Sequence, residues 1–165
     1  MSIESILVPV DGSSPSLAAL DHAIVLAELS GASLDVLHVA VADEFSVGAS
    51  VPLSSEAHDD IEAALDAAVE LAIERLGPRV ERLEIPGQPE RVIVETARAG
   101  SYDLIVIGTH GRIGRLHDLL GSVAEGVVRN APCPVMTVRE PAGGYQGFAE
   151  SRHHRPSIAD EALPR

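Results

Sequence analysis

Short apolar runs alternate with stretches of helical spacing along most of the chain. The runs are rich in Val, Ile and Leu and are bounded by Gly, Pro or Asp, which is typical of buried strands. Strands are predicted at residues 3–10, 33–40, 80–85, 103–107 and 134–138, and helices at 15–30, 55–76, 89–99 and 123–130. Because strand–helix–strand units form right-handed parallel crossovers, this order predicts an α/β fold: a doubly wound open sheet of five parallel strands with helices on both faces.

Local signals mark the ends of several elements. Ser14 is predicted to cap the first helix, with Pro15 at its first position, and Gly31 follows its last residue. Gly100 is expected to end the third helix. Residues 80–85 alternate between apolar and charged side chains, which indicates a strand at the edge of the sheet.

The periodic pattern ends near residue 139, and we expect residues 1–139 to form one domain. Residues 43–54 have no clear period and are expected to form a loop. Residues 140–165 contain few apolar side chains and are expected to be a flexible, disordered tail. The tail contains His153 and His154, but adjacent histidines in a flexible segment are poor ligands, and we predict no metal site on the protein.

The charge of the chain limits its partners. It contains 25 acidic residues and 12 basic ones, giving a formal net charge of −13, and every basic residue is Arg. Nucleic acids and anionic membranes attract basic surfaces, so we expect neither as a partner. An acidic chain without Lys resembles the proteins of extreme halophiles, and a halophilic protein is our hypothesis.

Cys133 is the single cysteine, so no disulfide can form within the chain. We expect it to be a small buried apolar side chain. The N-terminal residues lack the basic and long apolar regions of a signal peptide, and no segment reaches the length of a membrane span. These features favour a cytoplasmic protein.

Gly108, Gly111, Gly121 and Ser122 stand in the order Gly-x2-Gly-x9-Gly-Ser between the fourth predicted strand and the fourth helix. Glycines let the backbone approach an anion, and a helix N-terminus offers N–H groups and partial positive charge. In a doubly wound sheet, ligands bind beyond the carboxyl ends of the strands where the strand order reverses. If the first strand is central, Asp11 and Gly108 face each other there. The pattern therefore predicts a nucleotide-phosphate site.

Two familiar phosphate loops are excluded. A Walker A loop needs a Lys, which the chain lacks, and only Asp11-Gly12 stands where a dinucleotide fingerprint would follow the first strand. Purely structural roles stay open for two residues. Ser122 begins the sequence Ser-Val-Ala-Glu and fits a helix-capping box, and Asp before Gly is a common turn former.

Three segments resemble the universal stress protein family. They are Ile-Leu-Val-Pro-Val-Asp-Gly-Ser (residues 6–13), Gly-Thr-His-Gly-Arg-Ile-Gly (108–114) and the stretch from Leu-Leu-Gly-Ser-Val-Ala-Glu (119–125) to Asn-Ala-Pro-Cys-Pro-Val-Met-Thr-Val (130–138). The end of the second predicted strand, with Leu37, His38 and Val39, is similar to the same family. The complete glycine pattern matches the ATP-binding branch. The implied fold is the sheet of the adenine nucleotide α-hydrolases.

The resemblance implies ATP and Mg²⁺ as ligands and a homodimer formed through residues 134–138. It places Gly108 near the ribose, Asp11 at ribose and adenine, and backbone groups of Val39 at the adenine. By the same resemblance, the phosphates are held by Gly111, Gly121, Ser122 and the amide of Val123. Arg112 and Arg115 flank the loop, and Arg is suited to neutralising phosphate. The residues predicted to bind nucleotide are Val10, Asp11, Val39, Gly108, Gly111, Arg112, Gly121, Ser122 and Val123.

Three functions follow from these observations. The first is an ATP-binding stress-response module with regulatory activity. No nucleophile or base is evident, and His110 in the loop has no recognisable orienting partner, so we predict no catalytic residue and at most slow ATP hydrolysis. The second is a nucleotide-α-hydrolase-type enzyme. The third is a nucleotide-free dimeric domain that binds a partner.

Overall fold

The structure, a computed structural model, describes residues 2–40, 55–109 and 120–139, except for the side chains of residues 55–61. Its elements follow the predicted alternation of strands and helices. In chain order they are β1 (Ser5–Val10), α1 (Ser14–Ser30), β2 (Ser33–Ala40), α2 (Ser55–Leu76), the 3₁₀ turn η2 (Gly77–Arg79), β3 (Val80–Pro86), α3 (Pro89–Ala99), β4 (Leu104–Gly108), α4 (Ser122–Asn130) and β5 (Val135–Val138).

The five strands form one parallel sheet in the order β3-β2-β1-β4-β5. The predicted fold class is confirmed, with β1 in the centre, and β3 is an edge strand as its charged pattern indicated. The chain runs outward from β1 to β3 and then crosses to β4 on the other side. Strand order therefore reverses between β1 and β4, which is where sheets of this kind bind ligands.

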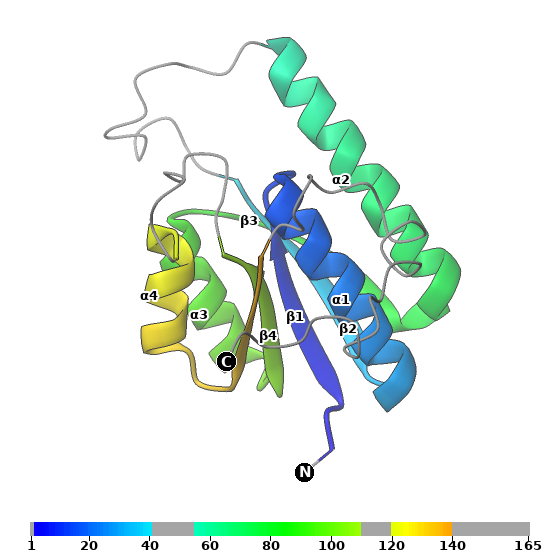
Figure 1. Cartoon of the computed structure of the whole chain (residues 1–165), viewed down its shortest axis with the longest axis vertical. Helices are drawn as coiled ribbons and strands as arrows, with labels where there is room; N and C mark the ends of the chain where they lie inside the picture. The colour runs from blue at the N-terminus through cyan, green and yellow to red at the C-terminus, as the bar shows by residue number, and fades with distance from the viewer. Residues whose placement is uncertain (1, 41–54, 110–119, 140–165) are drawn as a thin grey trace, which may run out of the picture.

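Helices cover both faces of the sheet, with α1 and α2 on one side and α3 and α4 on the other (Figure 1). Successive strand residues point to opposite faces, so β1 and β4 contribute to two separate cores. Ile6, Val8 and Val106 pack with α1 and α2, whereas Leu7 and Ile105 pack with α3 and α4. All five side chains are fully buried.

The predicted apolar faces of α1 and α2 lie in the first of these cores. Leu20 and Ile24 of α1 and Leu65 and Val69 of α2 are buried there. The two helices are also joined at their exposed side, because Arg75 donates two hydrogen bonds to the carboxylate of Glu28, at 2.8 and 2.6 Å. No helix within the described ranges is both long and apolar enough to span a membrane.

The observed bounds differ from the predicted ones by one or two residues at several ends. β1 begins at Ser5 rather than residue 3, and β4 at Leu104 rather than residue 103. The two starts meet at Asp103, whose carboxylate accepts hydrogen bonds from the amides of Glu4 and Ser5, at 2.9 and 3.0 Å. The predicted loop at 43–54 and the predicted tail at 140–165 lie outside the described residues.

Candidate functional site

The turn that follows β1 is built around Asp11. Its Oδ1 accepts hydrogen bonds from the amide of Ser13 at 3.0 Å and from the Ser13 hydroxyl at 2.5 Å. Its own amide donates to Ser16 Oγ at 3.3 Å. Gly12 adopts a positive φ of 76°, which a residue with a side chain rarely does. Asp11 thus has the turn-forming role that its sequence position allowed, and this role holds the end of β1 against α1.

The first helix begins one residue earlier than predicted. Its N-cap is Ser13, not Ser14, and the Ser13 hydroxyl accepts a hydrogen bond from the amide of Ser16 at 3.4 Å. Ser14 is the first helical residue and Pro15 the second. The prediction of Ser14 as the cap was wrong because two adjacent serines are equally suitable in sequence, and only Ser13 has the extended backbone of a cap.

At the end of β4, Gly108 lies against the first turn of α1. A Cβ atom on Gly108 would stand 2.7 Å from the carbonyl carbon of Pro15 and 2.9 Å from the amide nitrogen of Ser16. Only a residue without a side chain permits this approach. The parallel pairing of β1 with β4, Ile6 with Leu104 and Leu7 with Ile105, places the carboxyl ends of the two strands on the same side of the sheet.

Thr109 joins the ends of three elements. Its amide donates to the carbonyl of Val138 in β5 at 2.8 Å, and its carbonyl accepts from the amide of Gly121 at 2.6 Å. The residue is 3% exposed. The start of α4 is thereby fixed to the end of β4, beside β1. Thr109 was not among the predicted site residues, because these bonds depend on backbone atoms and carry no residue-specific signal.

The N-cap of α4 is Gly121, with φ −69° and ψ 158°, and Ser122 is the first helical residue. The capping-box interpretation of Ser122 is therefore wrong. Glu125 does not reach back to close such a box, since its carboxylate accepts from Arg129 at 2.7 Å instead. Ser122 is exposed and lies inside the helix. The cap residue, Gly121, has no side chain that could accept a hydrogen bond from the first amides of the helix.

The described residues of the predicted site all lie at the carboxyl ends of the strands, which we call the carboxyl edge of the sheet. Val10 ends β1 and Asp11 follows it, Val39 is the penultimate residue of β2, and Gly108 ends β4. The N-terminus of α4, with Gly121, Ser122 and Val123, is bound to the same edge through Thr109. Gly111, Arg112, His110 and Arg115 lie outside the described residues, as do His153 and His154.

Within the described residues, the titratable groups with shifted pKa values lie at the other end of the sheet, beside the amino ends of the strands. Backbone hydrogen bonds from Glu4 and Ser5 lower the pKa of Asp103. Burial, then the hydrogen bond that its hydroxyl donates to Asp35, raises the pKa of Tyr102. Burial also raises the pKa of Cys133, which is half-buried rather than fully buried as predicted. Asp103 and Tyr102 bond to residues of neighbouring strands, and all three groups lie away from the candidate site.

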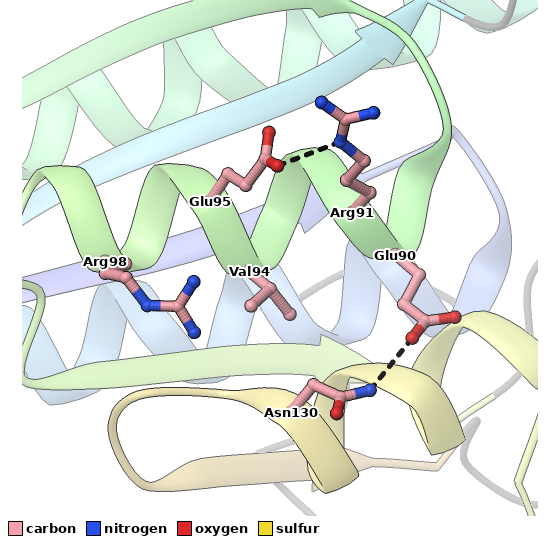
Figure 2. A pocket seen from close by; sticks show the side chains of 6 residues that line it. All are labelled: Glu90, Arg91, Val94, Glu95, Arg98 and Asn130. Carbon is pink, nitrogen blue, oxygen red and sulfur yellow. Dashed lines mark hydrogen bonds and ion pairs between the residues drawn. The ribbon is translucent and has the colours of Figure 1, made fainter.

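A shallow hollow of about 290 Å³ lies between α3 and α4 (Figure 2). Its lining residues are Glu90, Arg91, Val94, Glu95, Arg98 and Asn130. Two hydrogen bonds join its lining residues: Arg91 donates to Glu95 at 2.8 Å, and the side-chain amide of Asn130 donates to Glu90 at 3.0 Å. None of the predicted nucleotide-binding residues lines it, so it is distinct from the candidate site. Within the described part of the chain, no three His, Cys, Asp or Glu side chains gather as metal ligands would.

Comparison with known proteins supports one family. The model of the universal stress protein family matches residues 2–139. A universal stress protein of Methanocaldococcus jannaschii is 36% identical over 142 residues, covering 84% of this chain and 83% of the relative. A universal stress protein of Bacillus subtilis is 35% identical over 144 residues, covering 81% and 97% of the two chains.

Solved structures agree with this assignment. The universal stress protein UspA of Lactobacillus plantarum has a TM-score of 0.65 at 26% identity, covering 84% of this chain and 99% of its own. A universal stress protein in complex with cAMP has a TM-score of 0.63 at 28% identity, covering 84% and 98%. The Archaeoglobus fulgidus protein in complex with dAMP has a TM-score of 0.57 at 27% identity, covering 84% and 99%. Fold, sequence and family match together show that this chain belongs to the universal stress protein family.

Proposed function

We propose that the protein binds ATP at the carboxyl edge between β1 and β4 and acts as a regulatory module of the stress response, in the ATP-binding branch of its family. The observation that carries this proposal is the start of α4. A helix begins at the point where strand order reverses, and its cap residue is a glycine. Helix N-termini bind phosphate through N–H groups that have no acceptor within the helix.

The backbone conformation of Gly121 does not explain why a glycine stands at this position, and a bound ligand would. Its φ of −69° and ψ of 158° are extended values that any residue adopts. The backbone conformation therefore does not require glycine, in contrast to Gly12 with its φ of 76°. A missing side chain at the cap keeps space open beside the first amides of α4. At α1 the corresponding space is filled, because the Ser13 hydroxyl accepts from the amide of Ser16.

The remaining predicted residues complete the proposed site. Val10, Asp11 and Val39 would face the ribose and adenine from the ends of β1 and β2. Gly111 and Arg112 would complete the phosphate contacts from the segment between β4 and α4. Two structural relatives are complexes with cAMP and dAMP, which supports an adenine nucleotide as the ligand class.

We propose that Mg²⁺ binds together with the nucleotide. Mg²⁺ prefers oxygen ligands and keeps several waters when it is held by phosphates. The acidic residue of the described edge is Asp11, and its Oδ1 is already engaged by Ser13. The described part of the candidate site thus fits an ion held mainly by phosphate oxygens, which it would neutralise.

The proposed mechanism is binding rather than turnover. Backbone amides hold charge without supplying or removing a proton, and a general base needs a partner that orients it. The described groups of the candidate site are backbone groups, serine and threonine hydroxyls, and the carboxylate of Asp11, which is engaged in a turn. Binding of nucleotide would then change which surface the domain presents to a partner in the cytoplasm.

We also propose a homodimer through β5. This strand is the second edge of the sheet, and unlike β3 it carries no charged residue. In a parallel ladder alternate residues bond to the same neighbour. The amides of Ile105 and Thr109 donate to Pro134 and Val138, so the backbone groups of Thr137 point away from β4. Unpaired edges of this kind recruit a further strand.

The dimer is tested with Thr137→Pro and the matched control Thr137→Val. Proline removes an outward N–H and leaves the bonds to β4 in place, whereas Val retains the N–H. Light scattering after size exclusion should give a dimer for the wild type and Thr137→Val, and a monomer for Thr137→Pro. A monomeric wild type at micromolar concentration would rule out this assembly.

The nucleotide proposal is tested on the full chain in high-salt buffer. Purified protein is denatured and any released nucleotide identified, and the stripped protein is titrated with Mg-ATP by calorimetry. We expect saturable binding that Gly121→Val abolishes while the variant still folds, because the φ and ψ of Gly121 suit Val. The unfolding midpoint should fall slightly, because Val is a poorer N-cap than Gly. No bound nucleotide and no binding heat would favour the partner-binding alternative. Turnover above roughly 1 per second would favour the enzyme.

A further inference from the structure

We propose that the hollow between α3 and α4 is a docking surface for an acidic segment of a partner protein, held by a carboxylate that pairs with Arg98. The hollow, of about 290 Å³, lies along α3 beside Asn130, the last residue of α4 (Figure 2). It is separate from the proposed nucleotide site, and the proposal does not depend on nucleotide binding.

The helices on the two faces of the sheet differ in charge. α1 and α2 contain nine acidic residues and one Arg, whereas α3 and α4 contain three acidic residues and three Arg. The face covered by α1 and α2 therefore repels an acidic partner, and the face covered by α3 and α4 does so much less. Because complementary charge steers association, an acidic segment is expected on the face of α3 and α4.

Arg98 is the charged group of the hollow that is left for a partner. Arg91 donates to Glu95 at 2.8 Å, and the carboxylate of Glu90 accepts from Asn130 at 3.0 Å. Arg98 is exposed and makes no hydrogen bond or ion pair with the residues that the structure describes. A guanidinium can hold a carboxylate through two parallel N–H groups, so the open position favours a carboxylate as the partner group.

The spacing along α3 explains why Arg98 has no partner on its own helix. The residue four positions before it is Val94, which is buried and apolar. Glu95, three positions before it, is already bonded to Arg91. Figure 2 shows Val94 and Arg98 on the side of α3 that faces Asn130, and Arg91 and Glu95 on the other side. The guanidinium of Arg98 therefore lies beside an apolar floor and away from the ion pair.

Arg129 of α4 is the matched control for Arg98. Both arginines lie in the last turn of their helices, where the helix dipole favours a cation. Arg129 donates to Glu125 at 2.7 Å and is not among the lining residues of the hollow. The two residues thus share a position in the helix and differ in pairing and location.

Titration of the full chain with the peptide acetyl-Leu-Glu-Glu-Leu-Glu-Glu-amide, followed by NMR, tests the proposal at the lowest KCl concentration at which the protein is folded. The peptide should shift the amide signals of α3 and of the end of α4, and its affinity should fall as KCl screens the charges. The peptide acetyl-Leu-Lys-Lys-Leu-Lys-Lys-amide should not shift these signals. Equal shifts with acetate at the same carboxylate concentration would overturn the proposal, because the hollow would then bind free carboxylates rather than a protein segment.

Two variants decide whether Arg98 holds the segment. Arg98→Gln should weaken binding of the acidic peptide about fivefold, which corresponds to an ion pair worth about 1 kcal/mol. Arg129→Gln should bind it as the wild type does. Both side chains are exposed, so both variants should keep the circular dichroism spectrum of the wild type. Equal peptide affinity of the two variants would refute the role of Arg98.

The wild type alone provides two further outcomes. An absence of shifts at millimolar acidic peptide, or shifts confined to other elements, would refute the docking surface. Signals of α3 that shift with protein concentration before any peptide is added would show that a second copy of the chain, rather than a partner protein, occupies the hollow.

Discussion

Gly108 and Pro15 are in backbone contact, with no room for a side chain between them. A Cβ on Gly108 would be 2.7 Å from the carbonyl carbon of Pro15 and 2.8 Å from its oxygen. The contact joins the end of β4 to the start of α1 directly beside the proposed nucleotide. Packing alone therefore explains why residue 108 is a glycine, and a ligand contact is not needed to account for it.

Gly108→Ala should destabilise the protein by about 1–3 kcal/mol, the usual cost of forcing a methyl group into a packed backbone contact. Gly126→Ala in α4 is the matched control. Its new Cβ would meet the carboxylate of Glu90, the far end of a flexible and exposed side chain that can turn aside at the cost of its hydrogen bond to Asn130. Replacing Gly by Ala in a helix also contributes up to about 1 kcal/mol of stability. Urea unfolding of both variants checks the contrast, and equal stability losses would contradict it.

Two serines near the site have opposite roles, which alanine variants should separate. Ser13 caps α1, so Ser13→Ala should cost about 1 kcal/mol of stability. Ser122 is not a cap, so Ser122→Ala should change stability by less than about 0.5 kcal/mol. It should weaken ATP binding about tenfold or more, since a hydrogen bond to a charged group contributes about 1.5–3 kcal/mol.

Thermal unfolding and calorimetric titration of both serine variants provide the measurements. If Ser122→Ala lost as much stability as Ser13→Ala, the hydroxyl would have a capping role after all. If it kept the ATP affinity of the wild type, Ser122 would not contact the phosphates through its side chain.

The caps show where prediction from sequence ends. The order of strands and helices was predictable because buried faces impose a period on many residues, and the bounds of β2, α2 and α3 agree to the residue. A cap depends on the φ and ψ of one residue. Ser13 and Ser14, or Gly121 and Ser122, are indistinguishable by period, and only the fold decides which residue is extended.

Contacts between residues far apart in the chain also could not be predicted from the sequence. Asp103 was assigned to a strand, yet its carboxylate binds the amides of Glu4 and Ser5, about a hundred positions away in the chain. The candidate site was partly predictable, because the glycine spacing and the strand reversal point to one edge. The bond from Gly121 to Thr109 was not, since backbone groups leave no trace in the sequence.

In the turn between α3 and β4, substitutions at two neighbouring residues should change the stability of the protein in opposite directions. Gly100 ends α3 as expected, but the residue with positive φ is the next one, Ser101, at 53°, whereas Gly100 has −83°. The amides of Ser101 and Tyr102 donate to Arg98 and Ala97, as in a Schellman turn. Gly100 is a glycine because a Cβ would stand 2.3 Å from the ring of Tyr102.

Ser101→Gly should therefore stabilise the protein by about 0.5–1 kcal/mol, because glycine adopts positive φ without strain. Gly100→Ala should destabilise it by about 1–3 kcal/mol, because the ring of Tyr102 is held by the hydrogen bond to Asp35 and cannot move freely. Chemical unfolding curves would show the opposite shifts. A stabilising Gly100→Ala would mean that the ring moves aside easily.

Asp103 should make stability depend on acid pH. Its pKa is lowered in the folded protein, so its contribution is complete above the unfolded pKa of about 3.9 and is lost as pH falls through the folded pKa. We expect Asp103→Asn to be less stable than the wild type at pH 7, with the gap closing below about pH 4. Urea midpoints at several pH values measure this gap, with Glu70→Gln, an exposed change on α2, as the control. A gap that is constant with pH would rule out the carboxylate as its cause.

The net charge of −13 should make stability rise with salt. Screening of surface repulsion is largely complete near 1 M salt, where the Debye length is about 3 Å. A protein adapted to molar salt should continue to gain stability beyond that point, so the unfolding midpoint should rise from low KCl to roughly 1 M and then further at higher concentration. A midpoint that rises and then levels off would indicate charge screening alone. The highest midpoint in low salt would refute the halophilic hypothesis, because repulsion among the carboxylates would then not limit the stability of the fold.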